Sequence, residues 1–139
     1  LREPLDVLLP TNHPLADHAH IELCELTDQD WVGVEGGLMV DDVFKSIATL
    51  TGVTPRIIER VNDFRVLEEL VLAGIGIALI PRYVRLARDL VRRPISDIRL
   101  ARRIEAVVRT GAESRPAIAL VLAQLRAIAD LAAGQSVSE

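Results

Sequence analysis

The residues best suited to metal chemistry are three histidines near the start of the chain, His13, His18 and His20. Imidazole is a common metal ligand, and the three side chains lie within one loop-like segment rich in turn formers. No carboxylate or thiol at a diagnostic spacing completes a ligand set around them. A solvated loop therefore explains these histidines better than a metal site, and we expect no metal.

Acid and base chemistry would need paired carboxylates, and the candidates are Glu35, Asp41 and Asp42. Two aspartates in the first turn of a predicted helix are explained by their favourable interaction with the helix dipole. We therefore expect no catalytic activity.

A cofactor-binding interpretation starts from Gly74 and Gly76 in the stretch LVLAGIGIALIPR. A dinucleotide-binding fingerprint requires a strand, then glycines, then a helix whose N-terminus holds the pyrophosphate. Here the order is helix, glycines, strand, and a third glycine is missing. We therefore expect no bound cofactor.

The composition describes one globular domain of 139 residues, 50% hydrophobic and 26% charged. A net charge of −4 and an aromatic content of 3% argue against direct binding to nucleic acid. No uninterrupted apolar run reaches the roughly 20 residues that a membrane-spanning helix needs. The single Cys24 excludes an internal disulfide and fits a reducing compartment.

Strand and helix patterns alternate along most of the chain. This alternation predicts an α/β domain with a mixed or parallel sheet flanked by helices. Apolar positions at helical spacing predict helices over residues 39–51 and 64–73, and short β-branched or apolar runs predict strands over residues 5–10, 31–35, 55–61 and 76–80.

Glycines and caps fix where these elements end. Gly52 stops the first helix, and Asn62 and Asp63 are candidate caps of the second. Gly74 supplies the left-handed conformation that commonly ends a helix. The strand that follows at once is apolar on both faces, so we expect it in the interior of the sheet.

The last third of the chain is less regular. Pro116 opens an Ala/Leu-rich helix, followed by Gly134 and a frayed tail; its apolar stripe must be buried, so we expect it to pack on a second copy or on its own sheet. Before it, the pattern predicts a short surface helix over 82–90, a short strand or extended link over 91–95, and a strand over 98–110, where a helix also fits.

The segment EELVLAGIGIALIPR resembles the helix-to-strand signature of the effector-binding domain of LysR-type transcriptional regulators. Four further segments agree with that family in order and distance: PLDVLLPTNHPLA, LTDQDWVGVEGG, VTPRIIERVNDFRVLEELV and RPAIALVLAQLRAIA. Together the segments cover nearly the whole chain.

The resemblance implies a fold like that of type 2 periplasmic binding proteins, in which crossing strands join two α/β subdomains. Residues 1–11 would form a hinge strand, 12–97 the second subdomain, 98–133 the return hinge strand and closing helix, and 134–139 a tail. The winged helix-turn-helix, its linker helix and the first half of the first subdomain have no counterpart here. DNA contacts would therefore come only from that missing part.

The resemblance also implies a cytoplasmic homo-oligomer, away from membranes, that binds a small-molecule effector in a cleft. This chain alone would bind the effector weakly, because the other wall of the cleft is missing. The ligand's charge stays open, because Glu35, Asp41 and Asp63 would repel an anion. A solute-binding protein of a transporter is the alternative function.

The implied effector-facing residues are Gly36, Gly37 and Leu38 after the second strand, Asn62 and Asp63 after the third, and Gly76 and Pro81 around the fourth. Turn geometry alone also explains the glycines.

Overall fold

The computed structural model describes residues 1–35, 38–52 and 54–135, with no description of the side chains of residues 38–42 and 135. The chain divides into two compact units, one of Pro4–Ala101 and one of Leu1–Glu3 with Arg102–Glu139. Each unit is described by itself. Most of the first strand thus belongs to the larger unit, and the subdomain boundaries inferred from the resemblance remain a prediction.

A mixed sheet forms the centre of the larger unit, as the alternating pattern predicts. Its path is β3-β2-β4-β1-β5, with β6 paired to β1. β2 runs parallel to both β3 and β4, whereas β1 is antiparallel to β4 and β5. The strands are β1 (Arg2–Pro10), β2 (Asp30–Val34), β3 (Arg56–Val61), β4 (Ile77–Pro81), β5 (Leu90–Pro94) and β6 (Ala101–Arg103).

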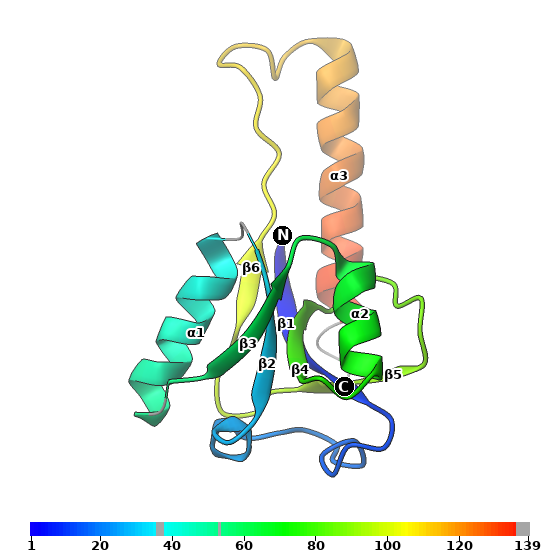
Figure 1. The fold of residues 1–139 in the computed structure, drawn as a ribbon. Coiled ribbons are helices and arrows are strands. Elements are labelled where there is room, and N and C mark those ends of the chain that lie inside the picture. Colours follow the sequence, from blue (N-terminus) through cyan, green and yellow to red (C-terminus); the bar gives the residue numbers. More distant parts are fainter. Residues whose placement is uncertain (36–37, 53, 136–139) are drawn as a thin grey trace. The chain divides into compact units, whose positions relative to one another are not determined.

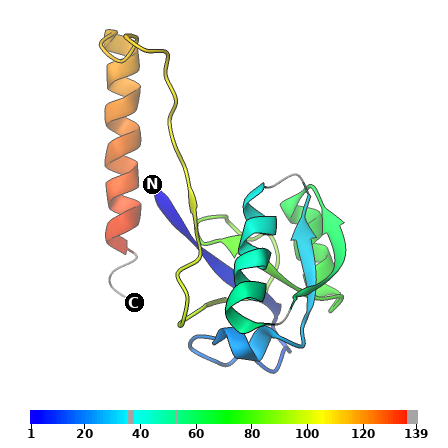
Figure 2. The ribbon, with the colours of Figure 1, turned by 90° about the vertical axis from the view of Figure 1, so that its left-hand side faces the viewer.

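Helices cover both faces of this sheet, because successive strand residues point to opposite faces. Trp31 and Ile77 pack with α1 (Leu38–Thr51) and the short 3-10 helix η1 (Leu23–Leu26). Val32 and Ala78, their neighbours along the strands, pack with α2 (Phe64–Leu72) on the other face. Figures 1 and 2 show α1 and α2 on opposite sides of the strands.

The transition from α2 to β4 confirms the prediction made from the glycines. Gly74 has φ 72°, and its backbone N–H donates to the carbonyl of Val71. After two intervening residues, Ile75 and Gly76, the chain enters β4, in which every residue is buried. The predicted helices and strands up to residue 80 are likewise confirmed within one to three residues at their ends.

The surface helix predicted over residues 82–90 is wrong, because the segment forms only turns and bends before β5. Side chains from outside the segment bind its backbone groups: the N–H groups of Ala87 and Arg88 donate to the carboxylate of Glu68. We call residues 82–90 the crossover loop, because they connect the parallel strands β4 and β5.

The strand predicted over residues 98–110 shrinks to β6, and the helix alternative there is also wrong. The N–H of Ile104 donates to the carbonyl of Leu1, the residue before β1. Beyond Ile104 the chain therefore has no further residue of β1 to pair with. A strand without a hydrogen-bonding neighbour is not maintained. Sequence patterns also missed η1, whose first turn lies within a polar stretch.

The smaller unit consists mainly of α3 (Pro116–Gln135), which runs through Gly134 rather than ending before it. Over Pro116–Gly134 this helix is long and apolar enough to cross a membrane by length and composition, contrary to our expectation. It includes Arg126 and Asp130, and its apolar side chains Val121, Leu125 and Ile128 are exposed. The packing expected for this stripe therefore remains a prediction.

Candidate functional site

The carboxyl ends of β2, β3 and β4 meet at one edge of the sheet, because the three strands are parallel. From β2 the chain continues to α1 on one face, and from β3 it continues to α2 on the other. Neighbouring strands whose connections leave to opposite faces create a crevice, where open α/β sheets bind ligands. At this crevice the backbone N–H of Glu35 donates to the carbonyl of Val61 at 2.5 Å.

The structure brings part of the predicted effector-facing set together at this carboxyl edge. Asn62 and Asp63 directly follow β3 and are exposed, and Pro81 is the buried last residue of β4. Leu38 is the first residue of α1, but its side chain lies outside the described part of the chain. Gly36 and Gly37 also lie outside the described residues.

Asp63 has a structural role as the cap of α2, as its position before the helix predicts. Its Oδ1 accepts hydrogen bonds from the backbone N–H groups of Arg65, at 2.7 Å, and Val66, at 3.4 Å. The positive end of the helix dipole therefore offsets its negative charge. Asn62 makes no such contact with the helix among the bonds of the described residues.

A buried ion pair lies behind this edge. The Arg82 guanidinium donates through Nε to Asp6 Oδ2 at 3.0 Å and through Nη2 to Oδ1 at 2.7 Å. Asp6 is only 4% exposed and lies in β1 beside the end of β4. Sequence analysis missed this pair, although a lone aspartate inside an apolar strand pattern is a signal that a cation lies near it.

Two further charged residues hold the crossover loop against the sheet and α2. Glu68, 2% exposed, accepts hydrogen bonds through Oε2 from the backbone N–H groups of Ala87 at 2.8 Å and Arg88 at 3.1 Å. Arg92 of β5 donates to the carbonyls of Arg82 and Val84. The hollow of about 550 Å³ between α2 and the loop is lined by Asp63, Phe64, Arg65, Glu68, Val84, Arg85, Leu86 and Ala87.

Gly76 lies at the opposite, amino edge of the sheet, before β4 rather than after it. The structure therefore does not bring Gly76 together with Asn62, Asp63 and Pro81. A Cβ at residue 76 would lie 2.7 Å from the backbone oxygen of Asp30. Close approach of two backbone segments explains the glycine at this position without a ligand.

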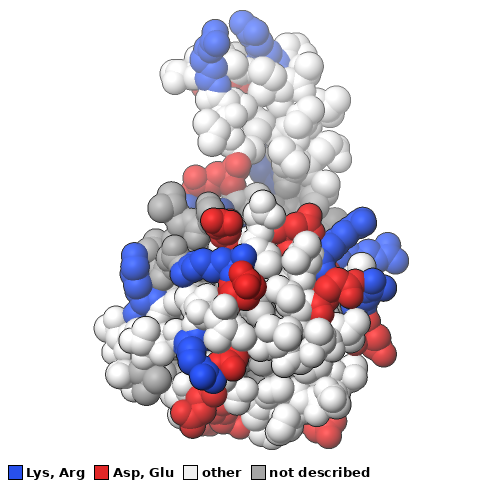
Figure 3. All heavy atoms as spheres, viewed as in Figure 1, with Lys and Arg blue, Asp and Glu red and all other residues white. Residues whose placement is uncertain are grey.

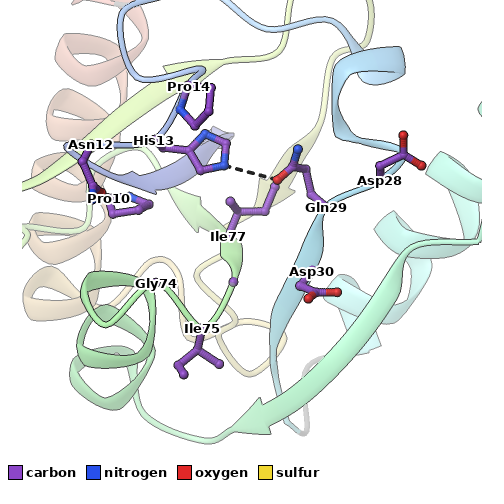
Figure 4. Close-up of a pocket in the computed structure, with 11 residues that line it drawn as sticks. Pro10, Asn12, His13, Pro14, Asp28, Gln29, Asp30, Gly74, Ile75 and Ile77 are labelled. Atoms are coloured by element: carbon purple, nitrogen blue, oxygen red, sulfur yellow. Dashed lines mark hydrogen bonds between the residues drawn. The ribbon is translucent and has the colours of Figure 1, made fainter.

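A second hollow, of about 340 Å³, lies at this amino edge (Figure 4). His13 and Gln29 meet across it, with His13 Nε2 3.2 Å from Gln29 Oε1. His13 Nδ1 accepts from the backbone N–H of Leu15 at 3.2 Å, so both ring nitrogens have partners. The lining residues are Pro10, Asn12, His13, Pro14, Asp28, Gln29, Asp30, Gly74, Ile75, Gly76 and Ile77.

The three histidines considered for metal binding lie in different surroundings. His18 contacts Glu25 at 3.1 Å, whereas His20 is exposed in the loop before Ile21. Within the described ranges no three His, Cys, Asp or Glu side chains gather in a way that would hold a metal ion.

Charges of both signs are mixed on the surface of the larger unit. Figure 3 shows acidic and basic side chains interspersed over the face that carries α1, β3 and α2. The ion pairs Arg56–Asp30 and Arg88–Glu69 are two examples. Such mixing differs from the continuous basic surface that binds phosphate backbones.

The family model described as LysR substrate binding domain matches residues 1–130. The HTH-type transcriptional regulator CysL of Bacillus subtilis is 25% identical over 100 residues, which are 72% of this chain and 33% of that protein. The chain thus spans about a third of the curated relatives it matches.

Solved structures agree in fold. The regulatory domain of Synechocystis PCC6803 CcmR in complex with 2-PG superposes with a TM-score of 0.74 at 20% identity, covering 92% of this chain and 64% of that one. The effector-binding domain of QuiR in complex with shikimate gives 0.65 at 22% identity, covering 73% and 49%.

Proposed function

Because the chain belongs to the LysR substrate-binding domain family, we propose that it is the effector-sensing part of a bacterial transcriptional regulator. The observation that carries this proposal is the family match over residues 1–130, which spans both compact units. The curated relatives are transcriptional regulators, which favours a sensing role over transport or catalysis. We propose a cytoplasmic protein without catalytic activity.

We propose that the effector is a small organic carboxylate bound at the carboxyl edge, in the crevice after β2 and β3. QuiR was solved with shikimate, which is a carboxylate. Of the acids near this edge, Asp63 is offset by α2 and Asp6 pairs with Arg82, whereas Glu35 is exposed to solvent, which screens its charge. Asn62 is exposed beside them and offers an amide donor.

The effector would act by a population shift. A ligand that prefers one arrangement of the two subdomains of a complete regulator stabilises that arrangement by its difference in affinity. The change would then alter the placement of paired DNA-binding domains in a homo-oligomer, with DNA contacted only by residues outside this chain.

A thermal-shift comparison of matched ligands tests the ligand class. Benzoate and shikimate should raise the melting temperature, and benzamide, which has the same ring as benzoate without the charge, should not. A tenfold excess over Kd stabilises by about 1.4 kcal/mol, or about 2–5 °C for a domain of this size. Equal shifts with benzoate and benzamide would contradict a carboxylate site.

The gene that encodes this chain tests the regulator assignment separately. A helix-turn-helix encoded upstream of Leu1 is the expected result. A secretion signal in that place would contradict the regulator and support the solute-binding alternative.

A further inference from the structure

We propose that Glu68 is a positioning residue for the effector site. Its buried carboxylate fixes the crossover loop to α2, and so fixes the position of these two elements relative to each other beside the carboxyl edge. This inference rests on the proposed function. Its structural half, the fixing of the loop, can be tested without a ligand.

Burying the charge of Glu68 is costly unless the carboxylate has partners. Glu68 is 2% exposed, and an ionised carboxylate is stable in such a place only when it is well hydrogen-bonded. Oε2 meets two successive backbone donors, those of Ala87 and Arg88. Hydrogen bonds to a charged group are stronger than neutral ones, so the pair of bonds defines the loop conformation there.

Backbone pairing holds only the first residue of the loop: the N–H of Arg82 donates to the carbonyl of Pro4 of β1, and between Arg82 and the start of β5 the described backbone bonds of the loop are local. Between the turn after β4 and the start of β5, the segment forms only bends. Arg92 fixes its first part through the carbonyls of Arg82 and Val84, and Glu68 fixes its second part through N–H groups. The loop is therefore held by two side chains of opposite charge, buried Glu68 and half-buried Arg92.

Glu68 and the crossover loop both lie near the carboxyl edge in the chain order of their elements. Glu68 is on the second turn of α2, five residues after the cap Asp63, and the loop begins at Arg82, directly after Pro81. Arg82 is also bound to Asp6 of β1. Glu68 thus links α2, which begins at the proposed effector crevice, with the part of the loop next to β5, while Arg82 and Arg92 hold the part next to the end of β4.

Hydrogen exchange of the 139-residue chain tests the fixing of the loop. Glu68→Leu keeps the size of the side chain and leaves both donors unpaired, so the amides of Ala87 and Arg88 should exchange about tenfold faster or more. Glu68→Gln keeps an acceptor oxygen and should raise their exchange about threefold. Glu69→Gln is the matched control, because exposed Glu69 pairs with the side chain of Arg88 rather than with the loop backbone in the described part of the chain, and it should change exchange less than twofold.

Titration with shikimate and benzoate in the same variants tests the positioning role. In Glu68→Leu the affinity should fall about tenfold, with partial recovery in Glu68→Gln and none lost in Glu69→Gln. Unchanged exchange at Ala87 and Arg88 in both Glu68 variants would overturn the proposal, as would full affinity in a variant whose loop is released. If Glu68→Leu does not fold, Glu68→Gln alone decides by the same two readouts. If neither carboxylate binds the unmodified chain, the proposed ligand class fails, and exchange alone then decides whether Glu68 fixes the loop.

Discussion

Gly76 approaches the backbone of Asp30 so closely that a Cβ at residue 76 would lie 2.7 Å from the Asp30 carbonyl oxygen. This contact allows the chain to enter β4 directly from the turn after α2, beside the start of β2. Gly74, by contrast, has φ 72° with open space around it. The two glycines of one motif are thus required for different physical reasons.

We predict that Gly76→Ala destabilises the chain by about 2–3 kcal/mol, because backbone must shift to accept the methyl group. Gly74→Ala should cost about 1–2 kcal/mol, the strain of a left-handed alanine. Urea unfolding followed by Trp31 fluorescence measures both. A smaller loss for Gly76→Ala than for Gly74→Ala would contradict this account.

We predict that Asp6→Ala lowers stability by about 3–5 kcal/mol, because it leaves the Arg82 charge partly buried without its carboxylate. Joint replacement of both residues, Asp6→Leu with Arg82→Met, should recover most of that loss. Glu105→Ala, which removes the exposed partner of Arg103, is the control and should change stability by less than about 1 kcal/mol. A double variant as unstable as Asp6→Ala would show that this ion pair is not the source of the effect.

The regular part of the fold could be predicted from local patterns. Period-two and period-3.6 apolar spacing located β1 to β4, α1 and α2, and Asp63 and Gly74 marked the ends of α2. These signals are local because they reflect burial of one face and the conformational freedom of single residues.

The crossover loop could not be predicted in this way. The loop depends on Glu68 and Arg92, which contact backbone groups far away in the sequence. Gly76 and Pro81 stand at the two ends of the strand predicted over residues 76–80, so the strand prediction already implies that they lie at opposite edges of the sheet. Only the contacts of the loop are made after the chain is folded.

We predict that Cys24 reacts slowly with iodoacetamide near neutral pH, although the residue is exposed. Local desolvation and the carboxylates of Glu22 and Glu25 raise the pKa of its thiol, whose sulfur lies 3.7 Å from Glu22 Oε2. Less thiolate is then present, and the thiolate is the reactive form. Glu22→Gln should accelerate alkylation, while Asp17→Asn, a loss of charge elsewhere, should not; equal rates in the two variants would refute this explanation.

We predict that the exposed apolar stripe of α3 makes the chain self-associate. Leu125 and Ile128 are 46% and 60% exposed, and an apolar stripe of this kind is stable when covered. In sedimentation experiments Leu125→Glu should lower the mass of the associated species, and Gln124→Glu, with the same added charge next to it, should not. A monomeric unmodified chain whose α3 amides exchange rapidly would argue against the prediction.

The most direct test of the central claim is to map shikimate binding on the backbone amides of this chain by NMR, which detects even millimolar affinity. If the effector site lies at the carboxyl edge, the amides of Asn62, Asp63 and Arg82 should show saturable chemical-shift changes. The amides around Gln29 and Gly76, at the amino edge, should change little. Shifts confined to the amino edge, or no saturable shift with shikimate or benzoate, would contradict it.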